Sequence, residues 1–184
     1  MLKKKKLFRG QSGEIKRILN EAEGISFGES PLDFFILLAR YKFAARFIKK
    51  HHTVLDVGCG HGLGTVFLSK FAGKVTGADY DEEMVKKNAI HYRSVENIGF
   101  TKIDLLKISN VNKKYDVVVS MDVIEHFTEK QTETVASNYA KMVKNSGFAV
   151  IGTPNIISQP YASERRKKTH IHEFEPAEFE TLLS

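Results

Sequence analysis

The sequence has little cysteine and no long apolar segment. Cys59 is its single cysteine, which excludes an internal disulfide and favours a reducing compartment. No apolar run approaches the roughly 20 residues that a membrane-spanning helix needs. The lysines at residues 3–6 are followed by Leu-Phe-Arg-Gly rather than by an apolar stretch, which is unlike a secretory signal. We therefore expect a cytoplasmic protein without a membrane span.

The composition is typical of one folded domain. Hydrophobic residues make up 42% of the 184 residues and charged residues 27%, a balance found in globular rather than disordered chains. The net charge of +6 gathers at residues 3–6 and 165–168. Such clusters can attract nucleic acid, phosphorylated substrates or acidic surfaces. They are more often simply solvated, and no interleaved aromatic residues favour nucleic acid here.

Short apolar runs alternate with helical patterns from residue 31 onward. Ser30, Pro31 and Asp33 form a helix start, and apolar residues at helical spacing extend that helix to about Lys50. We expect strands at 54–57, 74–78, 98–103, 115–121 and, after a turn at 145–147, 148–152. Helices are expected at 63–71, at 82–93 with Asp81 as the cap, at 128–144 with Thr128 and Gln131 as a capping box, and at 176–183. This alternation predicts an α/β fold, a Rossmann-like doubly wound and mostly parallel sheet with helices on both faces.

The expected domain covers residues 31–184, after an N-terminal extension at 1–30. Its strongest motif, Asp-Val-Gly-Cys-Gly-His-Gly, follows the first strand. Three glycines alternate along it: Gly58, Gly60 and Gly62. They allow a sharp turn that leaves backbone N–H groups free at a helix start. A dinucleotide fingerprint would need a glycine where Leu63 stands. Asp56 can help to anchor an ammonium, directly or through water, which favours S-adenosylmethionine (SAM) over NAD.

An acid and an aromatic residue follow the second expected strand. Asp79 stands where acids of nucleotide-binding βαβ units accept both ribose hydroxyls, and Tyr80 can lie against the adenine. A surface acid is the alternative reading of Asp79 taken alone. Its combination with the glycine turn favours ribose binding.

With these motifs the chain resembles the class I SAM-dependent methyltransferases, including the ubiquinone-pathway O-methyltransferases. LDVGCGHG, GADYD, KIDLL and KYDVVVSMDVIEH resemble successive family motifs, and GFAVIGTPN the fifth strand. The resemblance implies that Asp104 meets the adenine amino group. It implies a SAM site built from strand ends: Asp56, Gly58, Cys59, Gly60, Gly62, Asp79, Tyr80, Asp104, Leu105 and Met121. Arg40 and Tyr41 either reach the methionine end of the cofactor or lie at the surface.

The sequence departs from the family at its end. The family sheet closes with an antiparallel hairpin, which this chain lacks up to Ser184. We expect a C-terminally truncated domain. The alternative is that a partner chain covers the exposed sheet edge, because unpaired edges tend to associate. That partner could be a second copy of this chain, which would make a homo-oligomer.

Candidates for catalysis follow the fourth strand. Transfer to a hydroxyl needs an aligned acceptor and the loss of a proton, for which His126 is the natural base, with Glu125 beside it. Alternatively, Asp122, Glu125 and His126 hold a divalent metal together with His170. That set resembles the E-x-x-E-H and later histidine of ubiquinone-pathway and small-RNA terminal 2′-O-methyltransferases, with Asp122 in place of the first Glu. On the sequence alone, catalysis without a metal is preferred.

The sequence thus predicts a SAM-dependent methyltransferase. The expected acceptor is a hydroxyl of a small molecule or of a glycan or lipid precursor, bordered by the cationic segment 165–172. Two alternatives stay open: a metal-dependent RNA 2′-O-methyltransferase, and a non-catalytic SAM-binding scaffold. No motif names the acceptor, because this fold supports many acceptor chemistries.

Overall fold

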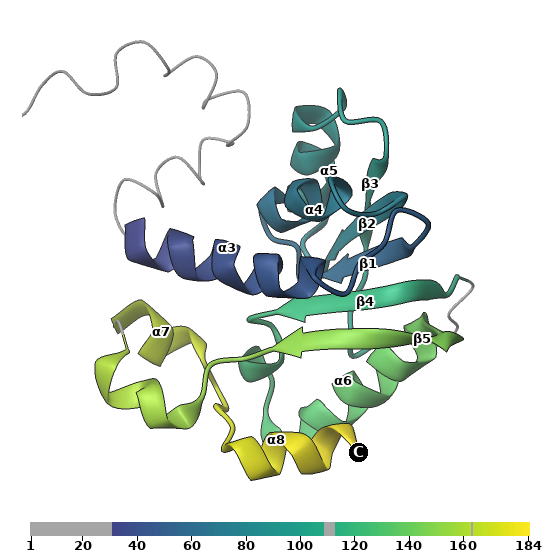
Figure 1. Cartoon of the computed structure of the whole chain (residues 1–184). Helices are drawn as coiled ribbons and strands as arrows, with labels where there is room; N and C mark the ends of the chain where they lie inside the picture. The colour runs from purple at the N-terminus through teal and green to yellow at the C-terminus, as the bar shows by residue number, and fades with distance from the viewer. Residues whose placement is uncertain (1–30, 109–112, 163) are drawn as a thin grey trace, which may run out of the picture.

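The protein is a parallel sheet with helices on both sides (Figure 1). A computed structural model describes residues 31–184 except 109–112 and 163, so the expected extension at 1–30 and the cap at Ser30 lie outside the described residues. Five strands pair in the order β3-β2-β1-β4-β5, every pair parallel. They are β1 Thr53–Val57, β2 Lys74–Asp79, β3 Ile98–Lys102, β4 Tyr115–Met121 and β5 Val143–Gly152. The predicted Rossmann-like fold is confirmed.

The described helices are α3 Pro31–Ala45, α4 Leu63–Ser69, α5 Glu82–His91, α6 Glu129–Met142, α7 Glu164–Thr169 and α8 Pro176–Leu183, with 3-10 turns η1 Ile124–His126 and η2 Ile156–Tyr161. Two helices, α5 and α6, begin at caps that the sequence predicts, Asp81 and Thr128. Asp81 Oδ1 accepts the Glu83 N–H at 2.9 Å at the start of α5. The Thr128 N–H donates to Gln131 Oε1 at 3.0 Å at the start of α6. Within the described residues, no helix is both long and apolar enough to cross a membrane.

Alternating residues of the central strands supply two apolar cores, one on each face of the sheet. Val54 and Val117 pack with residues of α3 and α4, whereas Leu55 and Val118 pack with residues of α6 and α8. Figure 1 shows α3 and α6 on opposite sides of the sheet. Because both faces are covered, β4 is apolar and buried over nearly its whole length, as expected of a central parallel strand.

Two boundaries differ from the prediction by more than two residues. Helix α3 ends at Ala45 rather than near Lys50, because the next N–H groups bond three residues back, and this tightens the chain into turns. Strand β5 begins at Val143, directly after α6, so the predicted turn at 145–147 is wrong. These residues lie at a shift in the β4–β5 register, where a Cβ on Gly147 would lie 2.5 Å from the Asp116 carbonyl oxygen. The turn-forming residues therefore lie at an irregularity within the strand, not in a turn before it.

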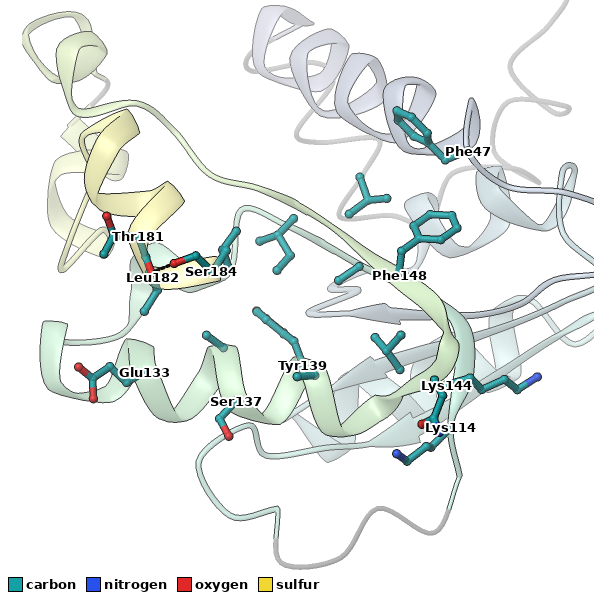
Figure 2. Close-up of a pocket in the computed structure, with 18 of the residues that line it drawn as sticks. Phe47, Lys114, Glu133, Ser137, Tyr139, Lys144, Phe148, Thr181, Leu182 and Ser184 are labelled. Carbon is teal, nitrogen blue, oxygen red and sulfur yellow. Dashed lines mark hydrogen bonds between the residues drawn. The ribbon is translucent and has the colours of Figure 1, made fainter.

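The outer edge of β5 is unpaired within the described part of the sheet. It borders an apolar groove of about 1160 Å³ between β5, α6, α8 and the end of α3. Figure 2 shows Phe47 and Phe148 on one side of β5 and Tyr139 of α6 on the other. None of the predicted cofactor-binding residues lines this groove. It is therefore a second surface, separate from the strand ends where a ligand is expected.

Helices α3 and α4 pack closely at Gly64, so a substitution there tests this part of the fold. A Cβ at Gly64 would overlap the ring of Tyr41, which is buried and held by Asp56. We expect Gly64→Ala to lower the free energy of unfolding by about 1–3 kcal/mol in urea denaturation, as overpacking does. Gly99→Ala is the matched control, because a Cβ there meets nothing within 4 Å. Equal losses in the two variants would contradict this packing.

Candidate cofactor and active site

The glycine turn has the sharp backbone that its sequence predicts. Gly58, Gly60 and Gly62 have φ angles of 70°, 49° and 87°, a left-handed region that glycine adopts without strain. The turn is fastened to the end of β2, because the N–H groups of Gly58 and Cys59 donate to the Ala78 carbonyl at 2.8 and 3.0 Å. The two strand ends therefore present one continuous surface.

Asp79 lies directly against this turn. Its Oδ2 accepts the Gly60 N–H at 2.9 Å, and its Oδ1 accepts the Asp81 N–H at 3.1 Å. Gly60 has open space on its Cβ side, and its carbonyl accepts the Asn88 amide at 2.6 Å from α5. A carboxylate has about four acceptor positions, so Asp79 keeps lone pairs for further hydroxyl groups. The geometry fits a ribose bound beside the turn.

Asp56 is buried beneath the turn rather than exposed on it. It is 0% exposed, and its two oxygens accept the Tyr41 hydroxyl at 3.1 Å and the Thr65 hydroxyl at 2.7 Å. Burial raises the pKa of Asp56 to about 7, although the two hydroxyl bonds act in the opposite direction. Asp56 thus joins β1 to α3 and α4, and its direct contact with a cofactor stays a prediction.

Asp56 is expected to make the protein less stable as the pH rises. Between its ordinary pKa near 4 and its folded pKa of about 7, the folded chain holds a proton that the unfolded chain has released. The free energy of unfolding should therefore fall over that range. We expect Asp56→Asn, which is neutral throughout, to remove this component of the slope when urea denaturation is compared at several pH values. Identical slopes for the variant and the wild-type chain would rule it out.

The predicted adenine side lies in the neighbouring loop. The Ile103 N–H donates to the Asp79 carbonyl at 2.9 Å, which holds the loop after β3 beside the loop after β2. Asp104 is partly exposed, and the Leu106 N–H at 3.0 Å lowers the pKa of its carboxyl. Tyr80 is 76% exposed. Both side chains are therefore accessible to a base lying over these loops.

Three other predicted cofactor-binding residues have buried side chains: Cys59, Leu105 and Met121. Burial raises the pKa of the Cys59 thiol, which makes it an unreactive core group. Leu105 packs in the core beneath α6, and its carbonyl accepts the Asn138 amide at 2.7 Å. Any contact of these residues with a cofactor would therefore come from the backbone or from a small exposed part of the side chain.

Asp122 turns toward α3. Its φ of 58° is left-handed, its N–H donates to the Gly152 carbonyl at 2.9 Å, and its carboxylate forms an ion pair with Arg40. Its Oδ1 is buried without a hydrogen-bond partner among the described residues. Non-glycine residues in this conformation often mark functional sites. The sequence left the place of Arg40 and Tyr41 open, and the structure brings both to the strand ends.

The remaining metal candidates gather in one place. Glu125, His126 and His170 each offer a ligand atom, and these atoms lie within 4.8 Å of one another. Glu125 is fully buried; its Oε2 accepts the Thr153 hydroxyl at 3.0 Å, whereas its Oε1 has no hydrogen-bond partner among the described residues. Asp122 does not belong to this group, which we call the Glu125 cluster.

The imidazoles of the Glu125 cluster present free nitrogens. His126 Nδ1 lies 2.8 Å from the Thr169 carbonyl, which only accepts, so Nδ1 carries the proton and Nε2 of the neutral ring has a lone pair. A buried carboxylate oxygen without a partner beside imidazole nitrogens is a donor set that fits a divalent metal. His172, by contrast, bonds Glu178 at 2.6 Å outside the cluster.

The Glu125 cluster lies next to the glycine turn. The Glu125 carbonyl accepts the N–H groups of Ile171 and His172 at 2.8 and 3.1 Å, which brings the chain after α7 onto η1. On the other side, Val123 fills the space where a Cβ of Gly58 would be. The glycine turn, the Glu125 cluster and the segment after β5 therefore lie next to one another.

Sequence reasoning missed the ion pair behind this site. Arg166 was expected among cations at the rim, but it donates to both oxygens of the buried Glu173, from Nε at 2.7 Å and from a terminal nitrogen at 2.9 Å. Although burial opposes it, bonds from Arg166 and His170 lower the pKa of Glu173. No local pattern indicated this pair, because Glu173 reads as one acid among several.

Comparisons with known proteins show the family of the chain. The sequence matches the methyltransferase-domain family over residues 54–147, just over half of the chain. The ubiquinone biosynthesis O-methyltransferase of Hydrogenovibrio crunogenus is 30% identical over 151 residues, which cover 72% of this chain and 60% of that protein. The chain thus spans less than two thirds of this relative's length.

Solved structures share the fold. The N-methyltransferase NodS of Bradyrhizobium japonicum, in complex with S-adenosyl-L-homocysteine, has a TM-score of 0.66 at 18% identity, covering 93% of this chain and 83% of NodS. A Haloferax volcanii methyltransferase complex with the Trm112 activator has a TM-score of 0.70 at 17% identity, covering 94% and 74%. At such identities the likeness concerns the fold.

Proposed function

The chain belongs to the class I SAM-dependent methyltransferases, and from this premise we propose that it methylates a hydroxyl oxygen of a small molecule or of a glycan or lipid precursor. The Glu125 cluster carries this proposal. A hydroxyl must lose a proton as it is methylated, and the cluster offers a carboxylate and two imidazoles for that purpose beside the cofactor turn. The name of the 30%-identical relative, an O-methyltransferase, supports the same class of acceptor.

In this proposal the strand ends hold SAM, which supplies an electrophilic methyl group on its sulfonium. Asp79 accepts the ribose hydroxyls, and Gly60 lets the cofactor approach the backbone closely. Asp104 accepts from the adenine amino group. Arg40 of α3, whose side chain reaches Asp122 just after β4, suits the cofactor's carboxylate. The methyl is then directed toward the segment after β5, where the acceptor would lie.

We further propose that the Glu125 cluster holds a divalent metal, with Asp122 outside the ligand set. The unpartnered Oε1 of Glu125 supports this, because a buried carboxylate oxygen is normally satisfied. When bound, the ion would lower the pKa of the acceptor hydroxyl and orient it. Without an ion, His126 Nε2 would take the proton itself.

The experiment is methyl transfer from labelled SAM to a metabolite extract and to RNA, before and after chelation. We expect labelled small molecules, a loss of transfer on chelation, and recovery when a divalent metal is restored. Transfer that ignores chelation would exclude the metal and leave His126 as the base. Transfer to RNA alone would favour the 2′-O-methyltransferase alternative. SAM binding by calorimetry without transfer to any acceptor would favour the scaffold.

We also propose that the β5 edge pairs with the same edge of a second copy. Lys114 and Lys144 lie at one end of the groove and Glu133 at the other (Figure 2), so antiparallel pairing places opposite charges together. We expect a dimer by light scattering at micromolar concentration, weakened in Glu133→Lys and unchanged in Glu129→Lys. A monomer at all concentrations tested would contradict edge pairing.

A further inference from the structure

The ring of His170 lies between two carboxylates. Its Nδ1 is 2.7 Å from Glu173 Oε1, a hydrogen-bond distance, and its Nε2 is 3.9 Å from Glu125 Oε1, too far for one. A carboxylate only accepts, so Nδ1 carries a proton toward Glu173. In the neutral ring, Nε2 then directs its lone pair at the Glu125 cluster. The hydrogen bond to Glu173 therefore sets the tautomer of His170.

Glu173 is itself held in place. Both of its oxygens are bonded by Arg166, whose terminal nitrogen also donates to the Ser158 hydroxyl at 2.8 Å. The carboxylate is buried, with its side chain only 4% exposed, so it has little freedom to rotate. A fork of two parallel N–H bonds from arginine fixes a carboxylate in orientation as well as in position.

We propose that Glu173 is a positioning residue that fixes the tautomer and the ring orientation of His170, so that Nε2 completes the Glu125 cluster. The inference rests on the metal site proposed above. Histidines that bind metals commonly donate their other N–H to a carboxylate, and loss of that partner weakens metal binding by about 10- to 100-fold. Arg166 acts one step further out, through Glu173.

The chain contains its own control for this inference. His172 also bonds a carboxylate, that of Glu178 at 2.6 Å, but through Nε2 and outside the Glu125 cluster. A general effect of removing a histidine–carboxylate bond would appear equally in Glu178→Gln. An effect specific to the cluster would appear in Glu173→Gln alone, because the amide replaces one carboxylate oxygen with an NH₂ donor that must face either His170 Nδ1 or the terminal nitrogen of Arg166.

The first measurement uses the whole chain without added metal. Imidazole nitrogen NMR at about pH 8, where ordinary histidines are neutral, reports which ring nitrogen is protonated. We expect His170 to be protonated at Nδ1 in the wild-type chain and in Glu178→Gln. In Glu173→Gln we expect a mixture of tautomers. A wild-type His170 protonated at Nε2, or an unchanged tautomer in Glu173→Gln, would overturn the proposal.

The second measurement is Co²⁺ binding by calorimetry, followed also by the visible absorption of the bound ion. We expect affinity to fall by about 10- to 100-fold in Glu173→Gln and by less than about 2-fold in Glu178→Gln. Equal affinities for wild type and Glu173→Gln would contradict positioning. A wild-type chain that binds no Co²⁺ would contradict the metal site instead, and the NMR comparison would still decide whether Glu173 fixes the ring.

SAM affinity serves as the test of folding in each variant. Should Glu173→Gln lose SAM binding as well, Arg166→Lys replaces it, because lysine keeps the positive charge but cannot bond both oxygens of Glu173. We expect a smaller shift in the same direction, in both the tautomer and the Co²⁺ affinity. No shift in Arg166→Lys would count against the proposal.

Discussion

An Asp79→Ala variant is expected to bind SAM about 100-fold more weakly than the wild-type chain, or worse. Hydrogen bonds to a charged group contribute about 1.5–3 kcal/mol each, and the proposed ribose contact has two of them. The substitution also removes the acceptor of the Gly60 N–H at the open side of the glycine turn. Calorimetric titration with SAM measures the loss directly.

The neighbouring Asp81 supplies the control for Asp79. Asp81 caps α5 by accepting the N–H groups of Glu83 and Met84 at 2.9 and 3.1 Å. Asp81→Ala is therefore expected to lower stability by about 1 kcal/mol, as lost caps do, while leaving the SAM affinity nearly unchanged. Normal SAM binding by a folded Asp79→Ala would end the ribose assignment.

The fold was predictable because its signals are local. The apolar runs, the caps at Asp81 and Thr128 and the glycine turn each lie within a few residues of chain, and parallel strands place their carboxyl ends at one edge. The start of β5 was not predictable. Asn145, Ser146 and Gly147 favour a turn, and they fall within the strand only because β5 pairs with β4 on both sides of them, at Val143 and from Phe148 onward.

The candidate site was predictable only in part, because some of its side chains are placed by contacts between residues far apart in the sequence. Asp79 follows directly from its place at a strand end. The position of Asp56 does not, because strand alternation directs its carboxylate to the α3 face, where Tyr41 and Thr65 meet it. A single left-handed residue at Asp122 separates its side chain from the Glu125 cluster. Such steps depend on tertiary contacts that one sequence does not contain.

A Glu125→Gln variant is expected to lose activity while gaining stability. The carboxylate is buried with one oxygen unpartnered, and relieving such a group can return about 1–3 kcal/mol of unfolding free energy. The amide has the same shape and can still accept from the Thr153 hydroxyl. It is a much poorer metal ligand, so we expect methyl transfer to fall about 100-fold, in line with the several kcal/mol that metal catalysis supplies.

The opposite signs of these two effects separate a catalytic Glu125 from a structural one. If Glu125 were needed only for folding, the variant would lose both stability and activity. If Glu125 is a metal ligand that lowers the stability of the fold, the variant loses activity but gains stability. Urea denaturation and the transfer of labelled methyl measure the two quantities on the same preparation. Glu129→Gln, at an exposed acid in the first turn of α6, controls for the loss of one negative charge near the site. A Glu125→Gln chain that is less stable, or that keeps full activity, would show that Glu125 is part of the scaffold and that the acceptor proton leaves by another route.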